Sequence, residues 1–257
     1  MQTFSIFAFL IPVLFLMLLH DYLPWLLPTL GAFLIICVLT RKLTISAAVT
    51  AAIIGLSVLL GAGFSAACML LTFFGLSVLA TSHKKTLKAE IHPESVNETG
   101  RSAAQVFANG GVAGILSLLT IVFPIHSDLF LLMLAGSLAS ALADTLSSEL
   151  GVVYGHRSFN IITFKKEAKG LDGVISIEGT LIGIAGALII AMIYSLDLRR
   201  ILIVAVAGTL GNIIDSILGS LLERKHLLGN NMVNFLNTLF AAVIAWAIYT
   251  VPIFSSN

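Results

Sequence analysis

The sequence predicts an all-α, polytopic membrane helix bundle, and its composition and hydropathy pattern both support this fold class. The chain has 257 residues, of which 58% are hydrophobic and 11% charged, and its mean hydropathy is +1.04. Soluble domains carry roughly 25% charged residues. The apolar residues gather in long runs, and most charges fall between these runs. This pattern excludes a soluble globular enzyme, a disordered chain and a secreted disulfide scaffold.

The apolar runs define the expected helices. A membrane span needs about 20 mostly apolar residues. Nine runs approach this length: Thr3–Leu19, Trp25–Thr40, Ile45–Leu60, Phe64–Ala80, Ala103–Phe123, Leu129–Leu146, Val174–Tyr194, Ile201–Leu222 and Val233–Val251. The first four contain no Asn, Asp, Gln or Glu, whereas each of the last five contains at least one of these residues. The sequence therefore predicts one integral-membrane domain, residues 1–257, with anchoring helices in 1–80 and site-bearing helices and loops in 81–257.

The distribution of basic residues predicts the orientation in the membrane. Twelve of the fourteen Lys and Arg residues lie in the loops after the second, fourth, sixth and eighth predicted spans, and the other two are Arg199 and Arg200. Because cytoplasmic loops are enriched in Lys and Arg, the N-terminus is predicted to be cytoplasmic and the C-terminus outside. We expect a cell-membrane protein. The net charge of +1 gives no reason to expect nucleic acid as a partner.

Two carboxylates lie within predicted spans, where an ionisable residue usually marks a functional site. Asp144 occurs in ALADTLSSELG and Asp215 in GNIIDSILGSLLE, each toward the predicted cytoplasmic end of its span. With Glu149 and Glu223 they place four carboxylates near one membrane edge. Hard oxygen ligands favour Mg²⁺, which typically bridges one or two protein carboxylates to substrate phosphates. The sequence thus predicts a magnesium site with its ligands among these acids.

Further polar residues share helix faces near the same edge. Arg101, Gln105 and Asn109 recur at helical spacing, as do Asn230, Asn234 and Asn237. Gly110 and Gly111 follow, and we expect them near a helix start, where backbone N–H groups can approach a phosphate. The two long basic loops, residues 81–102 and 152–173, flank the fifth and sixth spans and favour an anionic ligand on the cytoplasmic side.

Five segments together resemble a known family. They are QVFANGGVAG (105–114), ADTLSSELG (143–151), GVISIEGT (173–180), DSILGSLLE (215–223) and LGNNMVNFLNT (228–238). They are similar to the integral-membrane family of domain of unknown function 92, which includes transmembrane protein 19 and the phytyl-phosphate kinase of plants. The resemblance covers roughly residues 25–250. It departs from the family at 173–176, where the family's GGVS reads GVIS.

The resemblance implies a membrane kinase that transfers a phosphoryl group from a nucleoside triphosphate, with CTP as the expected donor, to an isoprenyl monophosphate such as phytyl phosphate. We expect Asp144, Glu149 and Asp215 to be catalytic and to hold Mg²⁺. The expected substrate- and nucleotide-binding residues are Lys84, Lys88, Arg101, Gln105, Asn109, Gly110, Gly111, Ser148, Lys165, Ser176, Thr180, Asn212, Asn231 and Asn234. The membrane is a partner, and the sequence leaves a homo-oligomer open.

Two other function classes fit part of the pattern. A cation- or proton-coupled transporter also uses intramembrane carboxylates, although transport sites usually lie near the midplane and these acids lie near one edge. A CDP-alcohol transferase would use the same metals and lipid acceptors, but its DGx₂ARx₈Gx₃Dx₃D pattern is missing. A purely structural membrane protein would leave the carboxylates unexplained.

Overall fold

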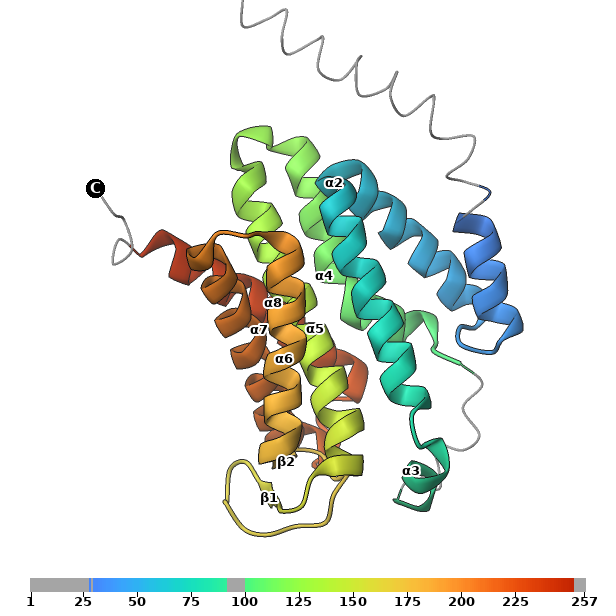
Figure 1. Cartoon of the computed structure of the whole chain (residues 1–257), viewed down its shortest axis with the longest axis vertical. Helices are drawn as coiled ribbons and strands as arrows, with labels where there is room; N and C mark the ends of the chain where they lie inside the picture. The colour runs from blue at the N-terminus through green and yellow to red at the C-terminus, as the bar shows by residue number, and fades with distance from the viewer. Residues whose placement is uncertain (1–27, 29, 92–99, 252–257) are drawn as a thin grey trace, which may run out of the picture.

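The chain folds as an all-α membrane bundle, as expected from its composition. The computed structural model describes residues 28, 30–91 and 100–251, and the regular structure of this part is almost entirely helical (Figure 1). Six of these helices are long and apolar enough to cross a membrane. The predicted span Thr3–Leu19 lies outside the described residues, and Trp25–Thr40 is represented by the shorter helix Leu30–Leu39. The predicted count of nine spans is therefore not confirmed.

Helix α2 (Ile45–Ser82) contains two of the predicted spans. Its 38 residues would extend about 57 Å as one straight helix, well beyond the ~30 Å hydrocarbon core. The helix instead breaks at Gly63, whose φ of +81° lies in the region that favours glycine. Figure 1 shows the blue and teal halves meeting at an angle there. The halves correspond to the expected spans Ile45–Leu60 and Phe64–Ala80.

The remaining elements follow α2 in short succession. They are α3 (Lys85–Ile91), α4 (Ala103–Val122), the 3₁₀ turn η2 (Pro124–His126), α5 (Ser127–Tyr154), β1 (Ser158–Asn160), β2 (Val174–Ser176), α6 (Ile177–Tyr194), α7 (Leu198–Leu218), the π-helical turn η3 (Gly219–Glu223) and α8 (Asn230–Thr250). Polar caps fix several helix starts: Ser102 and Gln105 form a capping box on α4, and Ser176 and Asp197 cap α6 and α7.

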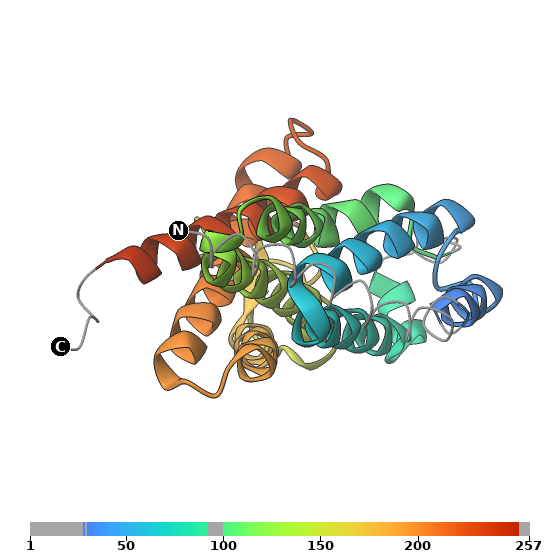
Figure 2. The same cartoon turned by 90° about the horizontal axis from the view of Figure 1, so that it is seen from above.

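Helix α5 is the centre of the bundle. It packs against α2, α4, α6, α7 and α8, and Figure 2 shows it enclosed by them in the view from above. Small residues permit this close approach. A Cβ on Gly208 of α7 would lie 2.6 Å from the Cβ of Ala139, and one on Gly136 of α5 would lie 3.0 Å from the Cβ of Ala245. Membrane helices associate through such close van der Waals contacts, because moving an apolar side chain from lipid to a helix interface gives no hydrophobic stabilisation.

The up-and-down order gathers one set of helix ends at a single end of the bundle. The ends of α2, α5 and η3 meet the starts of α4, α6 and α8 there, beside α3 and the β1–β2 hairpin (Figure 1). Twelve of the fourteen basic residues belong to this end, whereas Arg199 and Arg200 begin α7 at the other. We call it the basic end.

Candidate functional site

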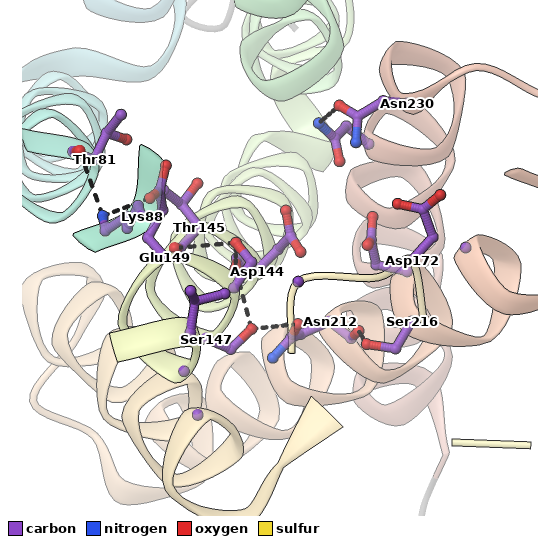
Figure 3. A pocket seen from close by; sticks show the side chains of 18 of the residues that line it. Thr81, Lys88, Asp144, Thr145, Ser147, Glu149, Asp172, Asn212, Ser216 and Asn230 are labelled. Atoms are coloured by element: carbon purple, nitrogen blue, oxygen red, sulfur yellow. Dashed lines mark hydrogen bonds and ion pairs between the residues drawn. The ribbon is translucent and has the colours of Figure 1, made fainter. Parts of the chain in front are cut away.

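A cavity of about 640 Å³ lies at the basic end of the bundle. Its walls come from the end of α2, from α3, from the starts of α4, α6 and α8, from the ends of α5 and α7, and from the hairpin. Figure 3 shows side chains from these elements facing a common space. Segments far apart in the sequence thus contribute to one site.

Two carboxylates from adjacent central helices form the acidic wall of the cavity. Asp144 of α5 and Asp215 of α7 both line it, both are partly buried, and their carboxyl groups are close enough to interact directly. The tight packing of α7 on α5 brings them together, because a Cβ on Gly211 would collide with the hydroxyl of Ser140. Two neighbouring carboxylates cannot both ionise cheaply without a cation or a shared proton.

Asparagine side chains hold this wall in place. Asn237 of α8, which is fully buried, donates from Nδ2 to Oδ1 of Asp215 at 3.0 Å and accepts a hydrogen bond from Ser140. Asn212, one turn before Asp215, accepts from the Ser147 hydroxyl at 3.0 Å. These bonds join α5, α7 and α8 at the cavity wall, so they couple the orientations of the three helices there.

The third predicted metal ligand, Glu149, is engaged elsewhere. Its Oε2 accepts from Lys88 Nζ of α3 at 2.6 Å, and Lys88 also donates to the carbonyl oxygen of Ala80 at 2.6 Å. The Lys88 side chain is 10% exposed and that of Glu149 is 26% exposed. Among the residues that the structure describes, no group of three or more His, Cys, Asp and Glu side chains is placed to hold a metal ion. The expected grouping of Asp144, Glu149 and Asp215 around one ion is therefore not preformed.

The cavity is also lined by basic residues, which we call the basic wall. Its residues are Arg41, Lys42, Lys85, Lys88, Arg101 and Lys169. Arg101 is fixed by its backbone: its N–H donates to Lys42 O at 3.0 Å, and its carbonyl accepts from Thr44 N at 3.1 Å. Burial lowers the pKa of the Arg101 guanidinium, and the Glu149 carboxylate partly offsets this. Guanidinium nevertheless stays charged at any physiological pH.

The β1–β2 hairpin forms a further wall and leads directly into α6. Its strands pair antiparallel, with Asn160 opposite Val174. Gly173 has a φ of +70°, and a Cβ there would lie 2.6 Å from Ser216 O and clash with the side chain of Ser220. Only glycine fits this approach to α7 and η3. The departure from the family pattern at 174–175 leaves this glycine in place.

Most of the predicted binding residues line the cavity. With Asp144, Glu149 and Asp215, they are Lys88, Arg101, Gln105, Asn109, Ser148, Ser176, Thr180, Asn212 and Asn234. Several of these side chains also make hydrogen bonds within the fold. Gln105 and Ser176 cap helices, and the Ser148 hydroxyl donates to the carbonyl oxygen of Asp144 in its own helix at 2.9 Å.

Five predicted binding residues do not line the cavity. Gly110 and Gly111 are a correction: α4 begins at Ala103, so both lie inside the helix, where their missing side chains make room for Ile54 and Phe107. Lys84 stacks over the Tyr154 ring at 5.0 Å. Lys165 is exposed in the hairpin, and Asn231 is exposed in the first turn of α8.

Other cavity residues were not among the predicted binding residues. They include Lys42, Lys85, Ser147, Asp172 and Ser216. Glu223, one of the four acids expected at this membrane edge, and Asn230, on an expected polar helix face, also line the cavity. Asp172 and Glu223 extend the acidic wall toward η3. Asn237 shares the expected polar helix face with Asn230 and Asn234, but it was not among the predicted binding residues.

Comparison with known proteins identifies the family. The sequence model of the family described as integral membrane protein DUF92 matches residues 28–242, and the chain belongs to that family. It is 35% identical to the uncharacterized membrane protein MJ0933 of Methanocaldococcus jannaschii, over 85% of this chain and 93% of that protein. It is 29% identical to the chloroplastic protein VTE6 of Arabidopsis thaliana, over 67% of this chain and 55% of VTE6. No solved structure matches the chain.

Proposed function

We propose that this member of the DUF92 family is a membrane phosphotransferase that converts an isoprenyl monophosphate, such as phytyl phosphate, into the diphosphate with CTP as donor. The observation that carries the proposal is a single cavity at the end of a membrane bundle that both carboxylates and basic side chains line. A family that includes phytyl-phosphate kinase, and the similarity to VTE6, support this chemistry.

The reaction asks for positioning and charge neutralisation rather than for covalent catalysis. An oxygen of the acceptor monophosphate forms a bond to the γ-phosphorus of the donor. The bond between that phosphorus and the β–γ bridging oxygen breaks, and a nucleoside diphosphate leaves. Two anions must approach each other, so the site has to supply several positive charges in a defined arrangement.

On the acidic wall, Asp144 and Asp215 would hold Mg²⁺. Their oxygen donors suit this ion, which commonly uses one or two carboxylates and fills its remaining positions with water and substrate phosphates. The ion supplies positive charge at the donor phosphates when it is bound. Asn237 would orient the Asp215 carboxylate by donating to its Oδ1. Glu149 has a different role in this proposal, which is to anchor Lys88.

On the basic wall, Arg101 is the principal phosphate contact. Its backbone is held at both ends and its guanidinium can bind a phosphate through two parallel hydrogen bonds. Lys42 and Lys85 add charge beside it. Lys88 donates to Ala80 O and to Glu149 Oε2 at 2.6 Å each, so its role in this proposal is to hold α3 against α2 and α5.

The position of the cavity suits one lipid and one water-soluble substrate. It lies where the apolar helices end, so a lipid phosphate can reach it while its chain stays in the bilayer. The excess of Lys and Arg at this end favours the cytoplasmic side of the cell membrane. The nucleotide would enter from that side.

The test is phosphoryl transfer by purified protein in detergent with Mg²⁺, phytyl or geranylgeranyl phosphate, and each γ-labelled nucleoside triphosphate in turn. We expect label in the lipid diphosphate with CTP, and none after Asp144→Asn. Asp128→Asn is the matched control, because Asp128 starts the same helix at the opposite end and is 75% exposed. Absence of label with every donor and chain length would overturn the proposal. Cation-dependent uptake into proteoliposomes would then favour a transporter.

A further inference from the structure

The tip of the β1–β2 hairpin, defined here as Ile162, Phe164, Lys165 and Lys166, has no role in the cavity. The base of the hairpin lines the site through Ser158, Ile161 and Lys169, but none of the four tip residues does. The tip projects away from the helices at the basic end (Figure 1). Its structure therefore needs a separate explanation.

The tip is a rigid turn built around one buried side chain. Asn160, which is 2% exposed, accepts hydrogen bonds at Oδ1 from Ile162 N at 2.9 Å and Thr163 N at 3.0 Å. Its Nδ2 donates to Ser220 Oγ of η3 at 3.0 Å. The backbone closes the turn, with Phe164 N donating to Asn160 O and Asn160 N donating to Lys165 O, each at 2.9 Å.

This turn presents an aromatic residue outward in an unfavourable backbone conformation. Phe164 has a φ of +56°, where glycine or asparagine is normally found, and it is 77% exposed. The Phe159 ring stacks on it, with ring centroids 6.4 Å apart. Ile162 beside it is 40% exposed. Apart from this stacking, the fold buries little of the Phe164 side chain, which points to a contact outside the described chain.

Charge and chain connectivity indicate what that contact is. Lys165 and Lys166 are exposed next to the apolar pair, and neither pairs with an acidic side chain in the part of the chain that the structure describes. The hairpin continues without a break from β2 into α6, whose first turns expose Ile177 and Leu181 along a membrane-spanning helix. The tip is thus connected directly to the end of a membrane-spanning helix. Apolar side chains with flanking lysines suit this place, because the apolar groups can contact acyl chains while the lysines contact anionic headgroups.

We propose that the hairpin tip is a membrane-surface anchor, which places Phe164 and Ile162 in the headgroup–acyl boundary and Lys165 and Lys166 on anionic headgroups. The anchor would hold one wall of the cavity against the bilayer surface. This inference does not depend on the reaction assigned to the cavity.

The test is tryptophan fluorescence of the full chain in lipid nanodiscs, in a background where Trp25 and Trp246 are replaced by Phe. Phe164→Trp should give blue-shifted emission that lipids brominated near the headgroup end of the acyl chain quench at least threefold more than they quench Ala168→Trp. Ala168 is an exposed residue of the same hairpin and is the matched control.

Anionic lipid should increase the quenching of the Phe164→Trp protein over that in zwitterionic lipid, and Lys165→Gln with Lys166→Gln should remove the increase. Water-like emission without quenching, or equal quenching at both tryptophan positions, would overturn the proposal and point to a soluble protein partner for the tip. Quenching that is indifferent to lipid charge and to both lysine substitutions would overturn the headgroup contact.

Discussion

Asn237 of α8 donates a hydrogen bond to Oδ1 of Asp215 on α7, at 3.0 Å, from a position with no exposure to solvent. The hydroxyl of Ser140 on α5 donates to the other end of the same amide. Because that hydroxyl occupies Oδ1 of Asn237, the amide must turn its NH₂ group toward Asp215. One asparagine of α8, itself held by α5, therefore fixes the orientation of a cavity carboxylate on α7.

We predict that Asn237→Leu lowers the kcat for phosphoryl transfer by about 10- to 100-fold, the usual effect of losing a group that orients a metal-binding carboxylate. The KM values for both substrates should change less than about threefold, because Asn237 does not line the cavity. Thr238→Val is the control: Thr238 is equally buried on α8, and its hydroxyl bonds only to backbone carbonyls. An unchanged kcat in Asn237→Leu protein would remove this role while leaving the kinase proposal intact.

Arg101 provides a test of the basic wall. Arg101→Gln removes a charged donor that faces the cavity, and losing a hydrogen bond to a charged group costs about 1.5–3 kcal/mol. We expect the KM for one of the two phosphate substrates to rise roughly 10- to 100-fold, as steady-state kinetics with each substrate varied in turn would show. Arg157→Gln should leave both KM values unchanged, since Arg157 is exposed and lies outside the cavity lining. Equal kinetics for the two variants would contradict the assignment.

The Lys88–Glu149 ion pair explains how the short helix α3 is held. Lys88 bridges the carbonyl of Ala80, near the end of α2, to Glu149 of α5, and all of these contacts are largely shielded from water. A charge left behind in such a place is costly, whereas removing both charges is often tolerated.

We therefore predict a non-additive double-mutant cycle for thermal unfolding in detergent. Lys88→Met and Glu149→Leu should each lower the apparent Tm, and the double variant should be more stable than the sum of the single effects predicts, by about 1–3 kcal/mol. The surface pair His156–Glu178, with the His156 side chain 84% exposed, should show near-additive behaviour in the same experiment. Additive effects at Lys88 and Glu149 would mean that the pair does not stabilise α3.

The fold class and the acidic wall could be predicted from the sequence, because both follow from local patterns. Apolar runs identify membrane helices, because lipid offers no hydrogen-bond partners and every backbone N–H and C=O group must therefore be paired within the protein. Asp144 and Asp215 stood out because a carboxylate in an apolar run is costly. The pairing of Glu149 with Lys88 could not be predicted in this way, since it depends on how a seven-residue helix folds back beneath α2.

The clearest error in the predicted site is the position of two glycines within their helix, although the start of that helix at Ala103 was predicted correctly. The run Asn109-Gly110-Gly111 resembled a helix start, but the capping box of Ser102 and Gln105 starts α4 six residues earlier. Inside the helix, the same glycines serve helix packing. Phosphate-binding glycines and packing glycines look alike in sequence, and only the position of the cap distinguishes them.

Glycine packing around α5 gives a prediction about stability. A Cβ on Gly208 would lie 2.6 Å from the Ala139 Cβ, 2.9 Å from the Ala139 carbonyl carbon and 3.1 Å from the Ala187 Cβ, so α7 would have to move away from α5. Overpacking of this kind costs about 1–3 kcal/mol. Gly208→Ala should therefore lower the apparent Tm, as circular dichroism of the protein in detergent would show.

Gly75→Ala is the matched control, because a Cβ at Gly75 in α2 would meet nothing within 4 Å. There the substitution should raise stability by roughly 0.5–1 kcal/mol, since alanine is the better helix former. Because Gly208 is one turn before Asn212, the displacement in the Gly208 variant should also reach the acidic wall and lower activity, while the Gly75 variant stays fully active. If the two variants shifted the apparent Tm in the same direction, close α5–α7 packing would not be what sets the depth at which Asp144 and Asp215 meet.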